Sequence, residues 1–305
     1  MQLVYEVPPL AKEEMLKRVT SPGLGTLLND IRLHHGEHSM TSEWHAVLKN
    51  WVSTSLLPDI TSSMREEVPF SLGEIDDLHF PWLSFGSINS SHLFGLDELI
   101  LFSFYWNNRH RYTNFLDLGA NVGLHSLVAS RLGMKATAVE PDRWHLAHLL
   151  SIASKNSLAY HEVIAGAATV TRGPVSFLRV EGNSTGSHIL GAKDNPYGDL
   201  TEIQIEGYPV TDLVKNKDLV KMDVEGLESD LLEALASTGF VDFDVLAEVG
   251  SRKNAASIFE VSRDTGVNIF CQKINWGKAE DQTELPHHHS EGSIFVSRSE
   301  VMPWC

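Results

Sequence analysis

The sequence is poor in cysteine and contains no long apolar run. Only Cys271 and Cys305 are cysteines among 305 residues, and neither belongs to a metal-binding or disulfide pattern. So few cysteines argue against a disulfide framework or a structural zinc site and are typical of the reducing cytosol. No stretch of about 18 apolar residues occurs that could form a membrane span, and residues 1–12 lack the basic-then-apolar order of a signal peptide. We therefore expect a cytoplasmic protein.

Basic residues are also scarce relative to acidic ones. Lys and Arg number 24 against 40 for Asp and Glu, which gives a formal net charge of −16. A field of this sign disfavours nucleic acids and anionic membranes. We therefore expect neither as a partner. Homo-oligomer formation stays open at this stage.

The most informative stretch of the chain is residues 115–123, an apolar run that turns through two glycines into a helix. The pattern predicts a buried strand, a helix and a second strand, with Glu140 at the end of the second strand. Gly119 and Gly123 are placed where the backbone approaches a ligand or takes a positive φ. The N–H groups that open the helix would face the ligand, and Glu140 would accept hydrogen bonds from both ribose hydroxyls. The stretch therefore predicts a site for a nucleotide-like cofactor.

The spacing of the glycines favours S-adenosylmethionine over a nicotinamide cofactor. Nicotinamide enzymes use G-x-G-x-x-G, because the second glycine lets a pyrophosphate approach the backbone. Here Asn121 replaces that second glycine, and no third glycine follows. Asp117 would repel a pyrophosphate but would attract the cationic methionine moiety of S-adenosylmethionine. A nicotinamide-dependent oxidoreductase stays as an alternative.

The periodicity of the chain divides it near residue 110. Residues 1–110 are expected to form a mostly helical N-terminal extension or cap, and 111–305 the cofactor-binding domain. After residue 111 strands and helices alternate, which is typical of an α/β protein with a doubly wound, Rossmann-like parallel sheet. The expected strands lie at 114–118, 135–139, 160–165, 175–180, 201–206, 218–223, 243–249, 267–274 and 293–297, and the expected helices at 97–109, 124–132, 143–155, 227–235 and 255–264.

The last two expected strands are joined by a loop without a helix. Parallel neighbours need a crossover, usually a helical one, so these two strands should be antiparallel. An antiparallel hairpin that closes a doubly wound sheet is the mark of the methyltransferase version of the fold.

Three motifs together resemble the FkbM-type methyltransferases. They are Asp-Leu-Gly-Ala-Asn-Val-Gly at 117–123, Glu140-Pro141, and Val-Lys-Met-Asp-Val-Glu-Gly-Leu-Glu at 220–228. The resemblance covers about 111–298. It implies an S-adenosylmethionine-dependent O-methyltransferase that acts on a hydroxyl of a sugar or a secondary metabolite, and it does not fix the acceptor. A non-catalytic S-adenosylmethionine-binding protein stays as a second alternative.

The resemblance also implies roles for individual residues. Asp117, Gly119, Asn121 and Gly123 would form the loop on the methionine side of the cofactor, and Glu140 would bind the ribose. The adenine would lie against Gly166 and Ala167. Asp223 would face the methyl group and the acceptor.

Methylation of an aliphatic hydroxyl, with a pKa of about 15.7, needs a base or a metal ion. Asp223 and Glu248 end neighbouring strands, so both should lie at one edge of the sheet, where they could hold Mg²⁺ or Mn²⁺. His188 lies in a Gly- and Ser-rich loop, 181–199, and could fold over the site as a general base. The simpler interpretation is a set of solvated acids and a surface histidine. We expect a neutral polyol acceptor under this loop, because its side chains suit arrays of hydroxyls.

Two further groups of histidines have simpler interpretations. His125 lies in the first turn of the expected cofactor helix and should be a packed or cofactor-contacting residue. The run 287–289 precedes the last expected strand and should lie at the surface, although one member could reach the substrate edge.

Overall fold

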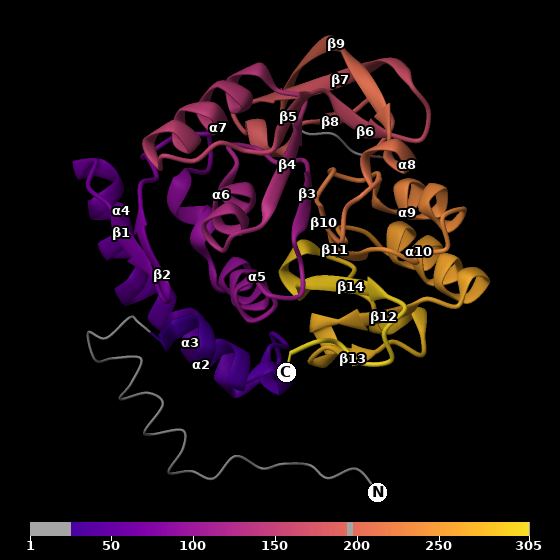
Figure 1. Ribbon diagram of the computed structural model, residues 1–305, viewed down its shortest axis with the longest axis horizontal. Helices are drawn as coiled ribbons and strands as arrows, with labels where there is room; N and C mark the ends of the chain where they lie inside the picture. The colour runs from indigo at the N-terminus through magenta and orange to yellow at the C-terminus, as the bar shows by residue number, and fades with distance from the viewer. Residues whose placement is uncertain (1–25, 194–197, 305) are drawn as a thin grey trace, which may run out of the picture.

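The computed structural model describes residues 26–193 and 198–304 (Figure 1). Its helices are α2 (Leu27–Leu33), α3 (Glu43–Trp51), α4 (Leu57–Glu66), α5 (Leu96–Asn107), α6 (Leu124–Arg131), α7 (Arg143–Lys155), α8 (Val210–Leu213), α9 (Glu228–Ala236) and α10 (Arg252–Thr265). Its strands are β1 (Phe70–Leu72), β2 (Ile75–Leu78), β3 (Asn114–Leu118), β4 (Lys135–Glu140), β5 (Glu162–Ala165), β6 (Ala167–Thr169), β7 (Gly173–Glu181), β8 (His188–Ile189), β9 (Asp199–Pro209), β10 (Leu219–Met222), β11 (Asp244–Glu248), β12 (Asn268–Cys271), β13 (Gly277–Lys278) and β14 (Ser293–Ser297). Over these described ranges, no helix combines the length and hydrophobicity needed to cross a membrane.

The central sheet has eight strands in the order β13-β12-β14-β11-β10-β3-β4-β5. Within this sheet, the five neighbouring strands β5, β4, β3, β10 and β11 run parallel to one another. Strand β14 is antiparallel to both of its neighbours, β11 and β12. The expected α/β fold, a doubly wound Rossmann-like sheet closed by an antiparallel hairpin, is therefore confirmed. A smaller sheet, β6-β9-β7-β8, lies beside β5 and carries the expected pair of added strands.

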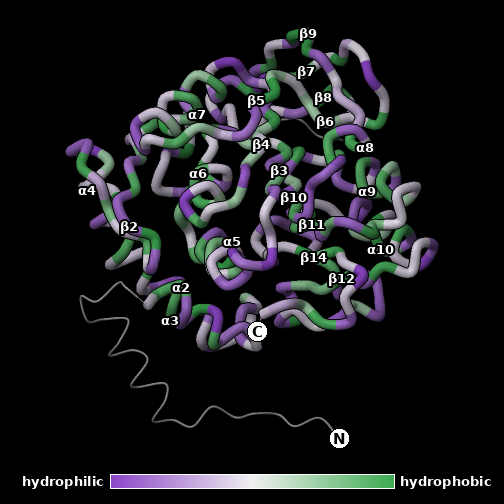
Figure 2. The backbone as a smooth tube through the Cα atoms, viewed as in Figure 1, coloured by the Kyte–Doolittle hydropathy of each residue, from purple (hydrophilic) through white to green (hydrophobic). Residues whose placement is uncertain are grey.

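Alternation along the central strands builds two separate layers of hydrophobic core. In β3, Phe115 belongs to the core on one face and Leu116 to the core on the other. Leu219 and Val220 of β10 divide in the same way, as side chains two residues apart share a face of a sheet. Helices α5, α6 and α7 contribute to the first layer, and α8, α9 and α10 to the second. Figure 2 shows the corresponding alternation of hydrophobic and hydrophilic residues along α9 and α10.

The N-terminal segment packs against the first of these layers. Leu28, Leu72 and Phe94 belong to the same buried cluster as Phe115 of β3 and Trp304 near the end of the chain. The expected helices of this segment are present, but β1 and β2 add a hairpin that was not expected. Glu74 in the hairpin turn accepts hydrogen bonds from the backbone N–H groups of Leu28 and Asn29, at 2.8 Å each, and so caps the start of α2. The proposed domain boundary at residue 110 stays a prediction.

A buried histidine joins this segment to the last strands of the sheet. The indole Nε1 of Trp276 donates to Nδ1 of His38 over 2.9 Å, and Nε2 of His38 lies 2.9 Å from the carbonyl oxygen of Ile31. Because the carbonyl can only accept, Nε2 carries the hydrogen and the ring is neutral. Burial lowers the pKa of His38 from 6.5 to about 3.

This histidine should make the fold sensitive to acid. The unfolded chain binds the proton near pH 6.5 and the folded chain only near pH 3, so stability falls as the pH drops between these values. From pH 7.5 to 5 the loss should be about 2 kcal/mol. Urea unfolding at pH 7.5 and pH 5 should show this loss in the wild type and a smaller one in His38→Gln. Equal pH dependence in both proteins would contradict the assignment.

Candidate active site

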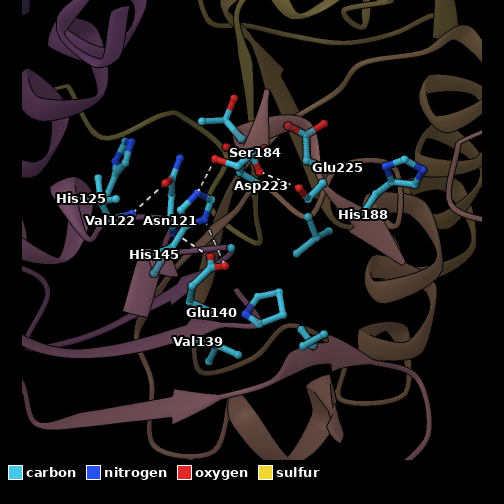
Figure 3. Close-up of a pocket in the computed structure, with 18 of the residues that line it drawn as sticks. Asn121, Val122, His125, Val139, Glu140, His145, Ser184, His188, Asp223 and Glu225 are labelled. Atoms are coloured by element: carbon cyan, nitrogen blue, oxygen red, sulfur yellow. Dashed lines mark hydrogen bonds and ion pairs between the residues drawn. The ribbon is translucent and has the colours of Figure 1, made fainter. Parts of the chain in front are cut away.

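A cavity of about 900 Å³, its open mouth included, lies at the carboxyl ends of β3, β4 and β10 (Figure 3). Ligands bind at this edge in open α/β sheets. The structure brings together six of the residues expected at the site: Gly119, Asn121, Glu140, Ala167, His188 and Asp223.

The glycines of the turn after β3 are required by the backbone and by packing within the protein. Gly119 has a φ of +75°, and a Cβ there would lie 1.8 Å from the carbonyl oxygen of Asp223. Gly123 has a φ of +85°, and its Cβ would lie 2.7 Å from Cγ of Leu149. Of the two expected reasons for glycine, positive φ is therefore present at both positions. The close neighbours that exclude a side chain are other parts of the chain.

Three of the residues expected at the cofactor do not line the cavity. The carboxylate of Asp117 is fully buried and accepts hydrogen bonds from the N–H and Oγ of Ser126, at 3.1 and 2.7 Å. It therefore faces the first turns of α6, and direct contact with a methionine moiety finds no support. Gly123 and Gly166 also lie outside the cavity wall, and a Cβ at Gly166 would lie 2.4 Å from the carbonyl oxygen of Glu206.

Glu140 is held by the backbone on both sides of its carboxylate. Oε2 accepts from the N–H of Asn121 and Oε1 from the N–H of Asp142, at 2.8 Å each. His145 continues the network, with Nδ1 3.4 Å from Oε1 of Glu140 and Nε2 3.0 Å from Oγ of Ser184 (Figure 3). Oε2 keeps a second lone pair for a ligand hydroxyl, whereas Oε1 already lies near a second nitrogen, Nδ1 of His145.

The loop expected over the acceptor contributes instead to this same cavity. Ser184, Thr185, Ser187 and His188 all line it. The simpler interpretation of His188 as a surface histidine is wrong, because the residue is 2% exposed and pairs with β7 as part of β8. Residues 194–197 of this loop lie outside the described residues.

The ring of His188 has one nitrogen with a hydrogen-bond partner and one without such a partner among the described residues. Nδ1 lies 3.0 Å from the carbonyl oxygen of Gly186, to which it donates. Nε2 is buried and has no hydrogen-bond partner within the described chain. Burial lowers the pKa of His188, so that near neutral pH its Nε2 offers a lone pair.

A second cavity of about 410 Å³ adjoins the first at the ends of β10 and β11. Glu248 lines this second cavity and not the first, together with Asp97 of α5 and His289. One member of the histidine run 287–289 therefore does reach the sheet edge. The two cavities share three residues, Glu98, Lys221 and Asp223.

Lys221 is a buried cation at this junction. Its Nζ lies 3.1 Å from Oδ2 of Asp223 and 4.0 Å from Oδ1 of Asp117, and the residue is 7% exposed. Burial alone would lower the pKa of Lys221, but Asp223 and Asp117 outweigh it and raise the pKa. Burial, followed by the charges of Asp223 and Glu98, raises the pKa of Glu248 well above its usual range.

The expected divalent metal on Asp223 and Glu248 is not supported by this arrangement. Within residues 26–193 and 198–304, no group of three or more His, Cys, Asp or Glu side chains is placed to hold an ion. The ammonium of Lys221 already lies against the carboxylate of Asp223. The residues do not fit a metal site, and we assign no chemical step to a metal.

Two residues of this site were not expected from the sequence. Glu98 stands in the first turn of an apolar helix, where an acid is readily explained by the helix dipole. Lys221 was part of the quoted motif but had no assigned role. Their shared position in the cavity walls depends on the packing of α5 near the end of β10, and this tertiary arrangement cannot be read from the sequence.

No family model and no curated protein sequence matches the chain. Among solved structures, the chain is similar to ribosomal protein L11 methylase from Lactobacillus delbrueckii subsp. bulgaricus, with 11% identity over 64% of this chain and 75% of that one, and a TM-score of 0.33. It is also similar to precorrin-6y C5,15-methyltransferase from Geobacter metallireducens GS-15, with 13% identity over 64% and 86% and a TM-score of 0.35. It is similar as well to the methyltransferase domain of METTL16, with 10% identity over 66% of this chain and 66% of that one, and a TM-score of 0.38. The likeness concerns the fold, and the substrates in those names belong to those proteins.

Proposed function

We propose that the chain is an S-adenosylmethionine-dependent O-methyltransferase whose acceptor is a hydroxyl of a sugar or secondary metabolite. The observation that carries the proposal is the first cavity, where the turn after β3, the acid that ends β4 and the start of β6 meet. The resemblance of residues 220–228 to the FkbM-type enzymes supports transfer to oxygen. The antiparallel closure of the sheet and Asn121 favour this proposal over a nicotinamide-dependent oxidoreductase.

The residues of this cavity fit the cofactor as a cradle of polar acceptors and small side chains. Glu140 would accept from the ribose hydroxyls, and Ala167 would leave space for the adenine. The turn 119–122 would face the methionine portion. When bound, the cofactor would supply a methyl group on a positively charged sulfur, beside the carboxylates of the cavity junction.

Of the three residues expected to act in catalysis, Asp223 has the best position, because it lines both cavities. Glu248 lies on the acceptor side only, and His188 on the cofactor side only. We therefore assign Asp223 to the acceptor hydroxyl, Glu248 to the wall of the acceptor space, and His188 to a hydrogen bond with the bound ligand. Such placement can contribute a large part of the rate, because alignment supplies roughly 7–11 kcal/mol in favourable cases.

Glu140→Ala is expected to weaken S-adenosylmethionine binding by about 1.5–3 kcal/mol, because two charge-assisted hydrogen bonds to ribose would be lost. Isothermal titration calorimetry gives the dissociation constants. Glu162→Ala is a matched control, because Glu162 is an exposed acid on the neighbouring strand β5 and does not line the first cavity. Glu140→Gln separates loss of charge from loss of the hydrogen bonds that the side chain gives the turn.

The same titration tests the proposed function as a whole. Wild-type protein should bind S-adenosylmethionine and S-adenosylhomocysteine and should not bind NADH. Binding of NADH alone would favour the oxidoreductase. Tight S-adenosylmethionine binding, without release of S-adenosylhomocysteine over a broad panel of hydroxyl compounds and glycans, would favour the non-catalytic alternative.

A further inference from the structure

A side chain of the N-terminal segment stands at the junction of the two cavities. Glu98 lies in the first turn of α5, outside the part of the chain that resembles a methyltransferase. Among residues 26–193 and 198–304, only Glu98, Lys221 and Asp223 line both cavities. If the cofactor occupies the first cavity, a methyl group that passes to an acceptor in the second must cross this junction.

The carboxylate of Glu98 lies against a buried histidine, and this histidine lies against a buried tyrosine. Nε2 of His125 lies 2.9 Å from Oε2 of Glu98, and Nδ1 of His125 lies 3.0 Å from the hydroxyl of Tyr105. In the neutral ring, Nδ1 accepts from the tyrosine hydroxyl and Nε2 then carries the hydrogen. Burial, then the charges of Asp117 and Glu98, raises the pKa of Tyr105, which stays protonated. Oε2 of Glu98 is thus buried beside Nε2 of His125, but it has no hydrogen bond among the described residues.

The partners of the three junction residues give them different capacities. Lys221 has no lone pair to offer as long as it is an ammonium, and its charge is taken up by Asp223 and Asp117. Asp223 has one oxygen against that ammonium, at 3.1 Å. Glu98 has an imidazole as its partner and has no ammonium within ion-pair distance among the described residues. Of the two carboxylates at the junction, Glu98 is thus the one without an ammonium in contact among the described residues.

We propose that Glu98 is the proton acceptor for methyl transfer to a hydroxyl bound in the second cavity, and that His125 is its positioning residue. The inference rests on the proposed function. The acceptor oxygen gains the methyl carbon and loses its proton to Glu98, while the sulfur keeps the electron pair of the broken bond and becomes a neutral thioether. The protein side of this step needs no further reactant.

The second cavity also restricts the class of acceptor. Its wall carries the carboxylates of Asp97, Glu98 and Asp223 against one ammonium, that of Lys221, and also Glu248, whose raised pKa favours the neutral acid. This charge would repel phosphorylated or carboxylated acceptors and suits the hydroxyls of an uncharged compound, which donate to carboxylates. A neutral polyol, the acceptor expected from the sequence, therefore fits, but in this cavity and not under the loop 181–199.

The first test needs no acceptor, because the cofactor and its product differ by one methyl group and one charge. A carboxylate facing the sulfonium favours S-adenosylmethionine over S-adenosylhomocysteine. In Glu98→Gln the dissociation constant for S-adenosylmethionine should rise about five- to tenfold, while that for S-adenosylhomocysteine should change less than about twofold. Glu233→Gln on α9, an exposed acid, gives the same change in net charge and should alter neither constant.

The role of His125 is tested in the same titration. His125→Gln retains an N–H donor that can reach Glu98 and should keep the ratio of the two constants near that of the wild type. His125→Leu should shift the ratio towards that of Glu98→Gln. A simple packing role would instead make the leucine variant bind both ligands equally less well.

The second test uses methyl transfer to the glycan or polyol that the wild-type protein accepts. Glu98→Gln should lower turnover by about 10²–10⁴-fold. His289 is an exposed residue at the second cavity. His289→Trp should fill this cavity and block methylation, while the dissociation constants for S-adenosylmethionine and S-adenosylhomocysteine stay unchanged. His289→Ala should not block methylation.

Three outcomes separate the possibilities. Selective loss of S-adenosylmethionine affinity in Glu98→Gln, with loss of turnover, supports the inference. Unchanged constants or unchanged turnover in folded Glu98→Gln would overturn it, as would normal methylation by His289→Trp. Failure of the wild type to bind S-adenosylmethionine at all would instead reject the proposed function itself.

Discussion

Replacing Lys221 by methionine is expected to lower the free energy of unfolding by about 3–5 kcal/mol, because it leaves the buried carboxylate of Asp117 without a counter-charge. Asp117 is fully buried, and its Oδ1 has no hydrogen-bond partner within the described residues, so the ammonium 4.0 Å away is its nearest compensation. Asp223 would lose its contact at 3.1 Å as well. Methionine has a similar length and adds no cavity. Urea unfolding at pH 7.5 measures the change.

Two further variants separate charge from packing at this position. Asp117→Asn combined with Lys221→Met removes a buried negative charge and should recover part of the lost stability, whereas a pure packing defect would not be recovered. Lys215→Met is the surface control, because Lys215 is an exposed lysine in an ion pair with Asp212, and such pairs contribute little. If Lys221→Met costs no more than this control, the ammonium does not stabilise the site.

The ion pair between Lys221 and Asp223 also bears on the metal site that was predicted from the sequence. Asp223 and Glu248 do end neighbouring strands, as the alternation of strands and helices predicted. Both line the second cavity, which confirms that they share an edge of the sheet. The sequence could not show that the side chain of Lys221, two residues before Asp223, lies against the Asp223 carboxylate.

Elements whose signals are local were predicted well. The bounds of β3, α7 and β14 agree residue by residue with the expected ranges, since each has a clear period and a clear stop. The antiparallel last pair could also be deduced, because the absence of a crossover helix is visible in the sequence.

Features that depend on long-range packing were missed. The loop that holds Ser184 and His188 was expected to lie over the acceptor, with an exposed connection as the simpler interpretation, because polar and glycine-rich segments are usually solvated. Its place in the wall of the first cavity was not foreseen. In the structure the backbone of Ser87 and Phe85 bonds to Gly182 and Ser184, at 2.7 and 3.0 Å, and fixes the loop over the first cavity. No local sequence pattern in either segment predicts these hydrogen bonds, because they join residues about 100 positions apart.

Asp223→Asn is expected to reduce turnover by about 100-fold with little change in fold, since a small misplacement of the acceptor oxygen has a cost of that order. The backbone at this position is set independently of the side chain, by the hydrogen bond of the Asp223 N–H to the carbonyl oxygen of Leu118 at 3.0 Å. Asparagine keeps the shape and removes the charge that orients the acceptor hydroxyl. Release of S-adenosylhomocysteine measures turnover, and thermal unfolding checks the fold.

The pattern of losses then distinguishes the two carboxylates at the junction. If Asp223 orients the hydroxyl and Glu98 removes its proton, the deficit of Glu98→Gln should shrink with a more acidic acceptor hydroxyl, because less help from a base is needed. The deficit of Asp223→Asn should persist, because orientation is needed for any acceptor. A matched control is Asp230→Asn, an exposed acid in the first turn of α9. Full turnover in a folded Asp223→Asn variant would remove Asp223 from the reaction and leave Glu98 as the carboxylate that serves the acceptor at this junction.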